Sequence, residues 1–257
     1  MTRYLKIWWH TALLSFQTAL ANRLGAAFFT AGKFLRFGLF IFFLSVLRQR
    51  LDQLSGYTFS QILTFFLIFN LFDLFGQIFF RGIYWFRDKV VSGQFDFNLL
   101  KPISALFQVL TSHTDILDLP LLGIVVFMLL NQPLSISFTQ GVSFLLISLS
   151  ALVVITAIHI SVAALGVITT EVDHTIMIYR DLSQMARVPI DIYTDTIRSL
   201  LTFAIPVALA FTFPAKALLG LLAPTTIALA LVGSMIFFYL SIKLWRLALS
   251  QYSSASS

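Results

Sequence analysis

Three polar side chains are spaced three and four residues apart inside a long apolar run of this sequence. Asn70, Asp73 and Gln77 therefore share one face if the run is a helix. An ionisable group within such a run normally faces protein or a water-filled cavity rather than lipid. Asp73 is a candidate either for a residue of a transport pathway or for one half of an interhelical ion pair.

Two basic residues occupy the preceding apolar run. Lys33 and Arg36 are about one helical turn apart. Long basic side chains can extend toward lipid headgroups from within a span, or they can face a substrate or an anionic lipid. Either residue is also a possible partner for Asp73.

Further titratable residues follow at His113, Asp115 and Asp118. Because no second His or Glu accompanies them, the spacing does not predict a metal site. A chain of carboxylates that includes Asp73, Asp115 and Asp118 would suit a proton-coupled secondary transporter, although no inverted repeat of the kind such carriers contain is visible. His159, in a later apolar run, is interpreted as a hydrogen-bonded core residue that could also face the pathway.

The composition indicates an integral membrane protein. Of 257 residues, 58% are hydrophobic and 11% charged, and the mean hydropathy is +0.91. Soluble domains carry about 25% charged residues. The chain has no cysteine, which excludes disulfides and thiolate metal sites. The net charge of +6 is typical of loops that face anionic lipid and does not require a nucleic-acid partner.

The apolar runs predict one all-α transmembrane domain over residues 1–257, with six membrane-spanning helices. An amphipathic helix at 1–22, rich in Trp and basic residues, is expected to lie in the membrane interface. Residues 247–257 are expected to be a disordered tail. The six expected spans cover residues 24–47, 59–80, 105–134, 141–168, 200–213 and 225–244.

The fifth of these runs is too short for a full crossing, which takes about twenty residues. It contains Pro206, and the apolar stretch after it, 214–224, begins and ends with proline, at Pro214 and Pro224. This pattern predicts a kinked or incomplete span followed by a short re-entrant or interfacial helix. Pro189 interrupts a charged segment, 171–198, that we expect to be cytoplasmic.

Basic residues set the expected orientation. The segments expected outside contain only Arg48, Arg50 and Lys216, whereas the other segments between spans and the two ends of the chain are richer in Lys and Arg. The bias predicts both termini in the cytoplasm. Segment 81–104, between the second and third spans, is then cytoplasmic.

Segment 81–104 combines dense charge with aromatic residues. One interpretation is an interfacial connector whose aromatic rings rest among the headgroups. The other is a short amphipathic element, bounded by glycine and proline, that docks a cytoplasmic partner. The candidate docking residues are Arg87, Asp88, Gly93, Phe95, Asp96, Phe97, Leu99, Lys101 and Pro102.

The sequence lacks an ATP-binding motif of its own. The nearest approach to a phosphate-binding loop, residues 25–33, has the wrong glycine spacing and is followed by Phe34 in place of Ser or Thr. No hydrolase motif and no calcium-binding loop is present. We therefore expect a non-enzymatic chain that binds no cofactor, and an apolar bundle of this kind is what a partner ATPase could drive.

Two stretches resemble the permease subunits of ABC-2-type transporters. They are residues 92–110 and residues 187–220, the second marked by Pro189, Pro206 and Pro214 as helix-breaking residues. The resemblance implies an exporter in a bacterial inner membrane, with a coupling helix at 81–104 and a second permease copy or paralogue. It also implies a separate ATPase subunit that holds ATP and Mg²⁺. A secondary transporter and a membrane scaffold are the competing classes.

Overall fold

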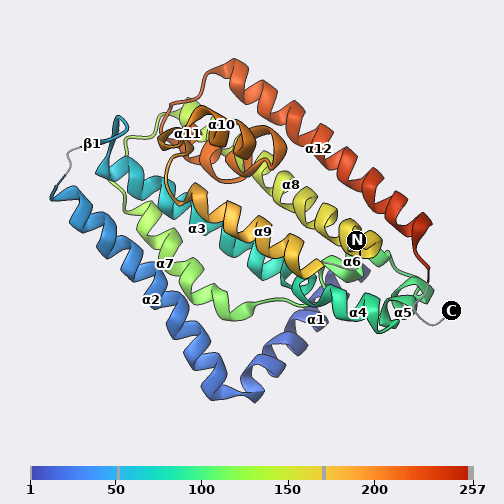
Figure 1. The fold of residues 1–257 in the computed structure, drawn as a ribbon. Helices are drawn as coiled ribbons and strands as arrows, with labels where there is room; N and C mark the ends of the chain where they lie inside the picture. The colour runs from blue at the N-terminus through green and yellow to red at the C-terminus, as the bar shows by residue number, and fades with distance from the viewer. Residues whose placement is uncertain (1, 51–52, 170–171, 254–257) are drawn as a thin grey trace.

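The computed structural model describes residues 2–50, 53–169 and 172–253, and helices dominate it. The helices form an elongated bundle (Figure 1). At the hairpin end, the strands β1 (Gln53–Leu54) and β2 (Tyr57–Thr58) pair antiparallel through a turn at Ser55 and Gly56. At the opposite end, which we call the C-terminal end, α5 (Gln94–Leu100) lies near the end of α12 (Pro224–Gln251).

The first two helices diverge from a sharp elbow (Figure 1). Helices α1 (Thr2–Ala21) and α2 (Arg23–Arg48) meet at Asn22, whose side chain accepts a hydrogen bond from the Gly25 amide and caps α2. Trp8 of α1 stacks on Phe79, with ring centroids 5.4 Å apart. The bounds of both helices lie within one residue of those predicted, and Met1 lies outside the described residues.

Helix α3 (Phe59–Phe80) is the centre of the bundle and has the predicted boundaries. It begins at a capping box, in which the Thr58 hydroxyl accepts from the Gln61 amide and the Gln61 side chain accepts from the Thr58 amide. Side chains on most sides of α3 are buried, including Leu67 and Ile68. A helix that is apolar on most of its surface belongs in the interior.

The predicted third span, 105–134, is wrong as a continuous helix. The chain forms α6 (Ala105–Leu110), a short turn η2 (Ile116–Asp118) and then α7 (Leu119–Leu130). Pro120 lies in the first turn of α7, where a missing backbone donor costs nothing. Asp115 and Asp118, at this break in the helix, form ion pairs with Lys33 of α2.

Helices α8 (Phe138–Thr169) and α12 pack along their lengths. The small residues predicted to allow close approach lie at this contact, where the Ser150 hydroxyl donates to the Ala230 carbonyl at 3.4 Å. Helix α12 continues to Gln251, so the expectation of disorder is wrong for residues 247–253. Tyr252 is held by hydrogen bonding and ring packing, and residues 254–257 lie outside the described part.

The charged segment 171–198 does not stay at one end of the bundle. It forms α9 (Val172–Gln184), η3 (Met185–Arg187) and η4 (Ile190–Ile192), beginning beside η1 (Arg81–Trp85) and running along α3 toward the hairpin end (Figure 1). There Asp191 accepts hydrogen bonds from the Tyr57 hydroxyl at 2.7 Å and the Lys216 ammonium at 2.9 Å.

The sequence predicts 171–198 in the cytoplasm and Lys216 outside, and the contact of Asp191 with Lys216 does not fit both predictions at once. The segment is highly charged, but it also contains three buried apolar residues that pack it into the bundle: Ile176, Ala186 and Ile190. Glu171, the first residue of the expected segment, lies outside the described residues.

The short fifth run is sharply bent. Helix α10 (Asp195–Ser199) with η5 (Leu200–Ala204) meets η6 (Ala208–Thr212) with α11 (Phe213–Leu218) at 86°. Pro206 lies at the break, where a proline ends a helix. The bend thus falls inside the predicted span 200–213 rather than in the stretch 214–224.

Within the described residues, four helical stretches are long and apolar enough to cross a membrane: α2, α3 with its extension to Val91, α8 and α12. The bent pair makes five if it counts as one span, and η2 with α7 forms a shorter apolar helix, Ile116–Leu130. The all-α membrane architecture follows from these elements.

Candidate functional site

The connection between α3 and α6 forms a compact helical element at the C-terminal end. Helix α4 (Phe86–Val91) is followed by Gly93 in the left-handed conformation, with φ of 73°, and then by α5. Only glycine adopts this conformation without strain. Lys101 is extended and precedes Pro102, so glycine and proline bound α5 as their positions predict.

Phe95 anchors α5 to the rest of the chain. Its side chain is 0% exposed and makes edge-on contacts with Phe86, Trp245 and Tyr252, at centroid distances of 5.2, 6.2 and 5.1 Å. The neighbouring Asp96 accepts a hydrogen bond from the Tyr252 hydroxyl at 2.9 Å. Phe95 is therefore a positioning residue inside the protein and does not offer its ring to a partner.

The opposite side of α5 is exposed and apolar. We call Val91, Phe97, Leu99 and Leu100 the exposed ridge, and Phe97 is 66% exposed. Asp88, Lys101 and Pro102 are exposed beside it, and Arg87 is half-buried. A rigid helix that presents an apolar ridge with charges at its margin has the form of a docking surface.

A chain of ion pairs joins this element to α2. The Lys33 ammonium lies 3.0 Å from Asp115 and also bonds Asp118, whose side chain is fully buried. The Arg81 guanidinium lies 3.9 Å from Asp115 and donates to Gln77 at 2.7 Å. Sequence reasoning offered Asp73 as the partner of Lys33, but the structure pairs Lys33 with Asp115 and Asp118.

Gly82 allows η1 to approach the α6–η2 connection. A Cβ atom at this position would lie 2.1 Å from the Ser112 hydroxyl oxygen and 2.9 Å from the His113 amide nitrogen. His113 contacts the Trp85 ring edge-on at 4.6 Å. Burial lowers the pKa of His113, and the nearby Asp115 carboxylate opposes this shift. Sequence analysis missed Gly82 and Arg81 because only the fold brings η1 against residues 112–115.

A second polar site, which we call the α2–α3 pocket, lies deeper in the bundle. Lys33, Arg36, Asn70, Asp73 and Arg187 line its polar side. The Asn70 amide donates to the Phe66 carbonyl of its own helix at 2.7 Å, and Gln77 turns to Arg81 instead. The predicted stripe on α3 thus divides between the pocket and the ion-pair chain.

The remaining predicted residues have structural positions. His159 is buried, its Nδ1 atom lies 2.7 Å from the Ile155 carbonyl, and its ring packs against Phe80 and Tyr179. Pro189 is buried just before η4, and Pro214 lies in the first turn of α11, where it does not break the helix.

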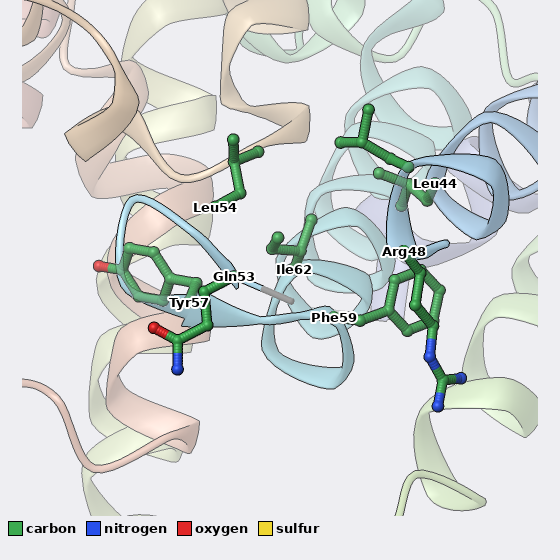
Figure 2. A pocket seen from close by; sticks show the side chains of 8 residues that line it. Leu44, Arg48, Gln53, Leu54, Tyr57, Phe59 and Ile62 are labelled. Atoms are coloured by element: carbon green, nitrogen blue, oxygen red, sulfur yellow. The ribbon is translucent and has the colours of Figure 1, made fainter. Parts of the chain in front are cut away.

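An apolar pocket at the hairpin end carries no comparable chemistry. It lies between the end of α2, the hairpin and the start of α3, and Leu44, Leu54 and Ile62 contribute to its lining (Figure 2). Arg48 passes over the Phe59 ring, at 5.1 Å from its centroid, and directs its guanidinium away from the apolar side chains (Figure 2).

The apolar helices, the internal polar pocket and the exposed helical element define a multi-pass membrane protein of the transport type. The sequence matches the ABC-2 family transporter protein over residues 34–256, which is most of the chain. The chain therefore belongs to the ABC-2 transporter family, whose members are permease components of ABC transporters. Comparisons with curated proteins and with solved structures gave no match.

Proposed function

We propose that this chain is the membrane-spanning subunit of an ATP-driven exporter and that a separate nucleotide-binding subunit docks on α5. One observation carries the proposal: Phe95 and Asp96 fix α5 to α12 from inside, while the exposed ridge remains free on the other side. A partner that closes on ATP has to push on a rigid element. ATP and Mg²⁺ would be held by that partner.

The proposed topology has six crossings with both termini in the cytoplasm of a bacterial inner membrane. The fifth crossing is α9 to η4, and the bent pair that follows it is re-entrant on the outer side. This arrangement is supported by Asp191 beside Tyr57 at the hairpin end, and by α5 and the C-terminal residues together at the other end. Helix α1 would then lie in the inner membrane interface, with Trp9 exposed to headgroups.

A second permease, a copy or a paralogue, would complete the translocation path. In the most apolar stretch of α2, only 11% of the residues are buried. The exposed residues of this helix include Leu35, Leu39 and Phe42. Phe203 of the bent pair is exposed as well. An interface over these elements would leave the α2–α3 pocket beside the path.

A proton-coupled secondary transporter is less well supported. Its proposed carboxylates do not form a hydrogen-bonded relay, because Asp115 and Asp118 bind Lys33 whereas Asp73 has no ion pair with Lys33.

The test is co-purification followed by transport. The chain, co-expressed with a candidate ABC ATPase subunit, should retain that subunit in detergent and should move substrate into inverted vesicles only with ATP. Transport that follows a pH gradient without nucleotide would support the secondary transporter and exclude our proposal.

A further inference from the structure

The α2–α3 pocket combines cationic and aromatic walls. Its polar lining includes Arg36 from α2, Asp73 from α3 and Arg187 from η3. Its lining also includes the rings of Phe37, Phe40 and Phe66 and two leucines, and the free space between these side chains is about 10 Å³, so a ligand has to displace some of them. Guanidinium groups next to aromatic rings bind molecules that carry a charged group on an apolar body.

The charges around this pocket do not cancel. Arg36, Arg180 and Arg187 all lie within electrostatic range of the single Asp73 carboxylate. Lys33 also lines the pocket, but Asp115 and Asp118 already neutralise it together with Arg81. Three guanidinium groups therefore share one carboxylate, which leaves a positive excess.

Within the described residues, no carboxylate is paired with the guanidinium groups of Arg36, Arg180 and Arg187. The Arg187 guanidinium lies 5.6 Å from the Phe40 ring centroid and 5.9 Å from that of Phe69. These cation–π contacts hold its position without supplying a negative charge.

Uncompensated charge is costly between membrane-spanning helices and persists where it serves a ligand. Arginine presents a planar fork of donors that matches phosphate or carboxylate oxygens in pairs. A ligand anion between Arg36 and Arg187 would cancel the excess, and Asp73 would limit how strongly the anion is held. Release matters in a transporter, since a ligand bound too tightly is not passed on.

We propose that the α2–α3 pocket binds the anionic group, a phosphate or a carboxylate, of an amphiphilic substrate, and that the phenylalanine wall holds the adjoining hydrocarbon. This assignment names the substrate class of the proposed exporter. It rests on the proposed function only in calling the bound molecule a substrate. Binding itself requires neither ATP nor a partner subunit.

The test is calorimetric titration of the purified full chain in a nonionic detergent with octyl phosphate. Arg187→Gln and Arg36→Gln should each weaken binding about tenfold, a change equal to about 1.4 kcal/mol. Asp73→Asn should tighten binding several-fold, because it removes the competing negative charge. Arg246→Gln, a matched exposed arginine on α12, should leave the affinity unchanged.

The arginine variants and Asp73→Asn should change the affinity in opposite directions. This separates a binding site from a structural role, because a loosened bundle would bind octyl phosphate less tightly in every pocket variant. Equal losses in Asp73→Asn and Arg187→Gln, or equal binding of octyltrimethylammonium, would overturn the proposal. If inorganic phosphate binds as tightly as octyl phosphate, the claim that the phenylalanine side chains hold the hydrocarbon of the ligand is overturned. Thermal unfolding of each variant without ligand confirms that it is folded.

A final arm identifies the source of the anion. Chain reconstituted in phosphatidylglycerol vesicles loses the octyl phosphate response if a bilayer headgroup occupies the pocket, and keeps it if the natural ligand is a free amphiphile. Phosphatidylcholine vesicles are the reference. ATPase co-purification without octyl phosphate binding would leave the exporter proposal standing and remove only this inference.

Discussion

The Tyr252 hydroxyl donates a hydrogen bond to the Asp96 carboxylate at 2.9 Å, although the two residues are 156 positions apart. Tyr252 lies just beyond α12 and Asp96 lies in the first turn of α5, so this bond ties the end of the chain to the proposed docking element. The Tyr252 ring also packs edge-on against Phe95.

Tyr252→Phe keeps the ring contact and removes the hydrogen bond. We expect the variant to lose about 1 kcal/mol of stability and several-fold of ATP-driven transport, because α5 is less firmly held. Burial, with the Asp96 hydrogen bond, raises the pKa of Tyr252 to about 12. The hydroxyl contribution is therefore present below the ordinary tyrosine pKa of about 10 and lost as pH rises through about 12. Tyr239→Phe, at an exposed site on α12, should match wild type in both assays.

Phe95→Ala and Phe97→Ala should fail in different ways. Removing the buried Phe95 ring should cost about 3–5 kcal/mol of stability, because it leaves a cavity. Removing the exposed Phe97 ring should leave thermal unfolding unchanged and weaken ATPase association by about 2 kcal/mol. Unfolding scans and pull-down titrations measure the two effects. Normal ATPase binding by Phe97→Ala would favour the interfacial connector.

Lys33→Met should destabilise the protein by about 3–5 kcal/mol, because it leaves Asp118 buried without its cation. Thermal unfolding in detergent measures the change. The double variant Lys33→Met with Asp118→Leu should recover much of the loss, since it removes the orphaned charge. A single variant as stable as wild type would show that the ion-pair chain contributes nothing.

Mild acid should destabilise the contact between η1 and the α6–η2 connection through His113. Burial lowers the pKa of His113 in the folded protein, so the unfolded chain binds the proton more readily. Stability therefore falls as pH drops below the ordinary histidine pKa of about 6.5. His113→Gln should reduce the loss of stability between pH 7 and pH 5.5. His10→Gln, at an exposed position of α1, should have no effect on that slope.

Labelling tests the course of residues 172–192. Because the chain has no cysteine, each introduced cysteine is unique. In oriented vesicles, an impermeant maleimide should reach Thr194→Cys from the same side as Gln53→Cys, and Ser92→Cys only from the other side. All three positions are exposed. Labelling of Thr194→Cys and Ser92→Cys from one side would return the segment to the cytoplasmic surface.

The sequence alone determined the class of protein and several of its elements. The apolar run placed α3 at residues 59–80, and the local capping box of Thr58 and Gln61 begins the helix at the same point in the structure. Gly93 and Pro102 marked the limits of α5, since their backbone preferences act without tertiary contacts. The low charge and apolar runs likewise predicted membrane helices, and the lack of an ATP-binding motif pointed to a partner.

Only the tertiary structure decided which charges meet. Pattern reasoning offered Lys33 or Arg36 as a partner for Asp73, but the break before α7 brings Asp115 and Asp118 to Lys33. It also predicted segment 171–198 in the cytoplasm, because high charge normally means contact with water. In the bundle, the buried side chains of Ile176, Ala186 and Ile190 pack part of that segment into the protein. Partners of a buried charge come from elements distant in sequence, so spacing along the chain carries no information about them.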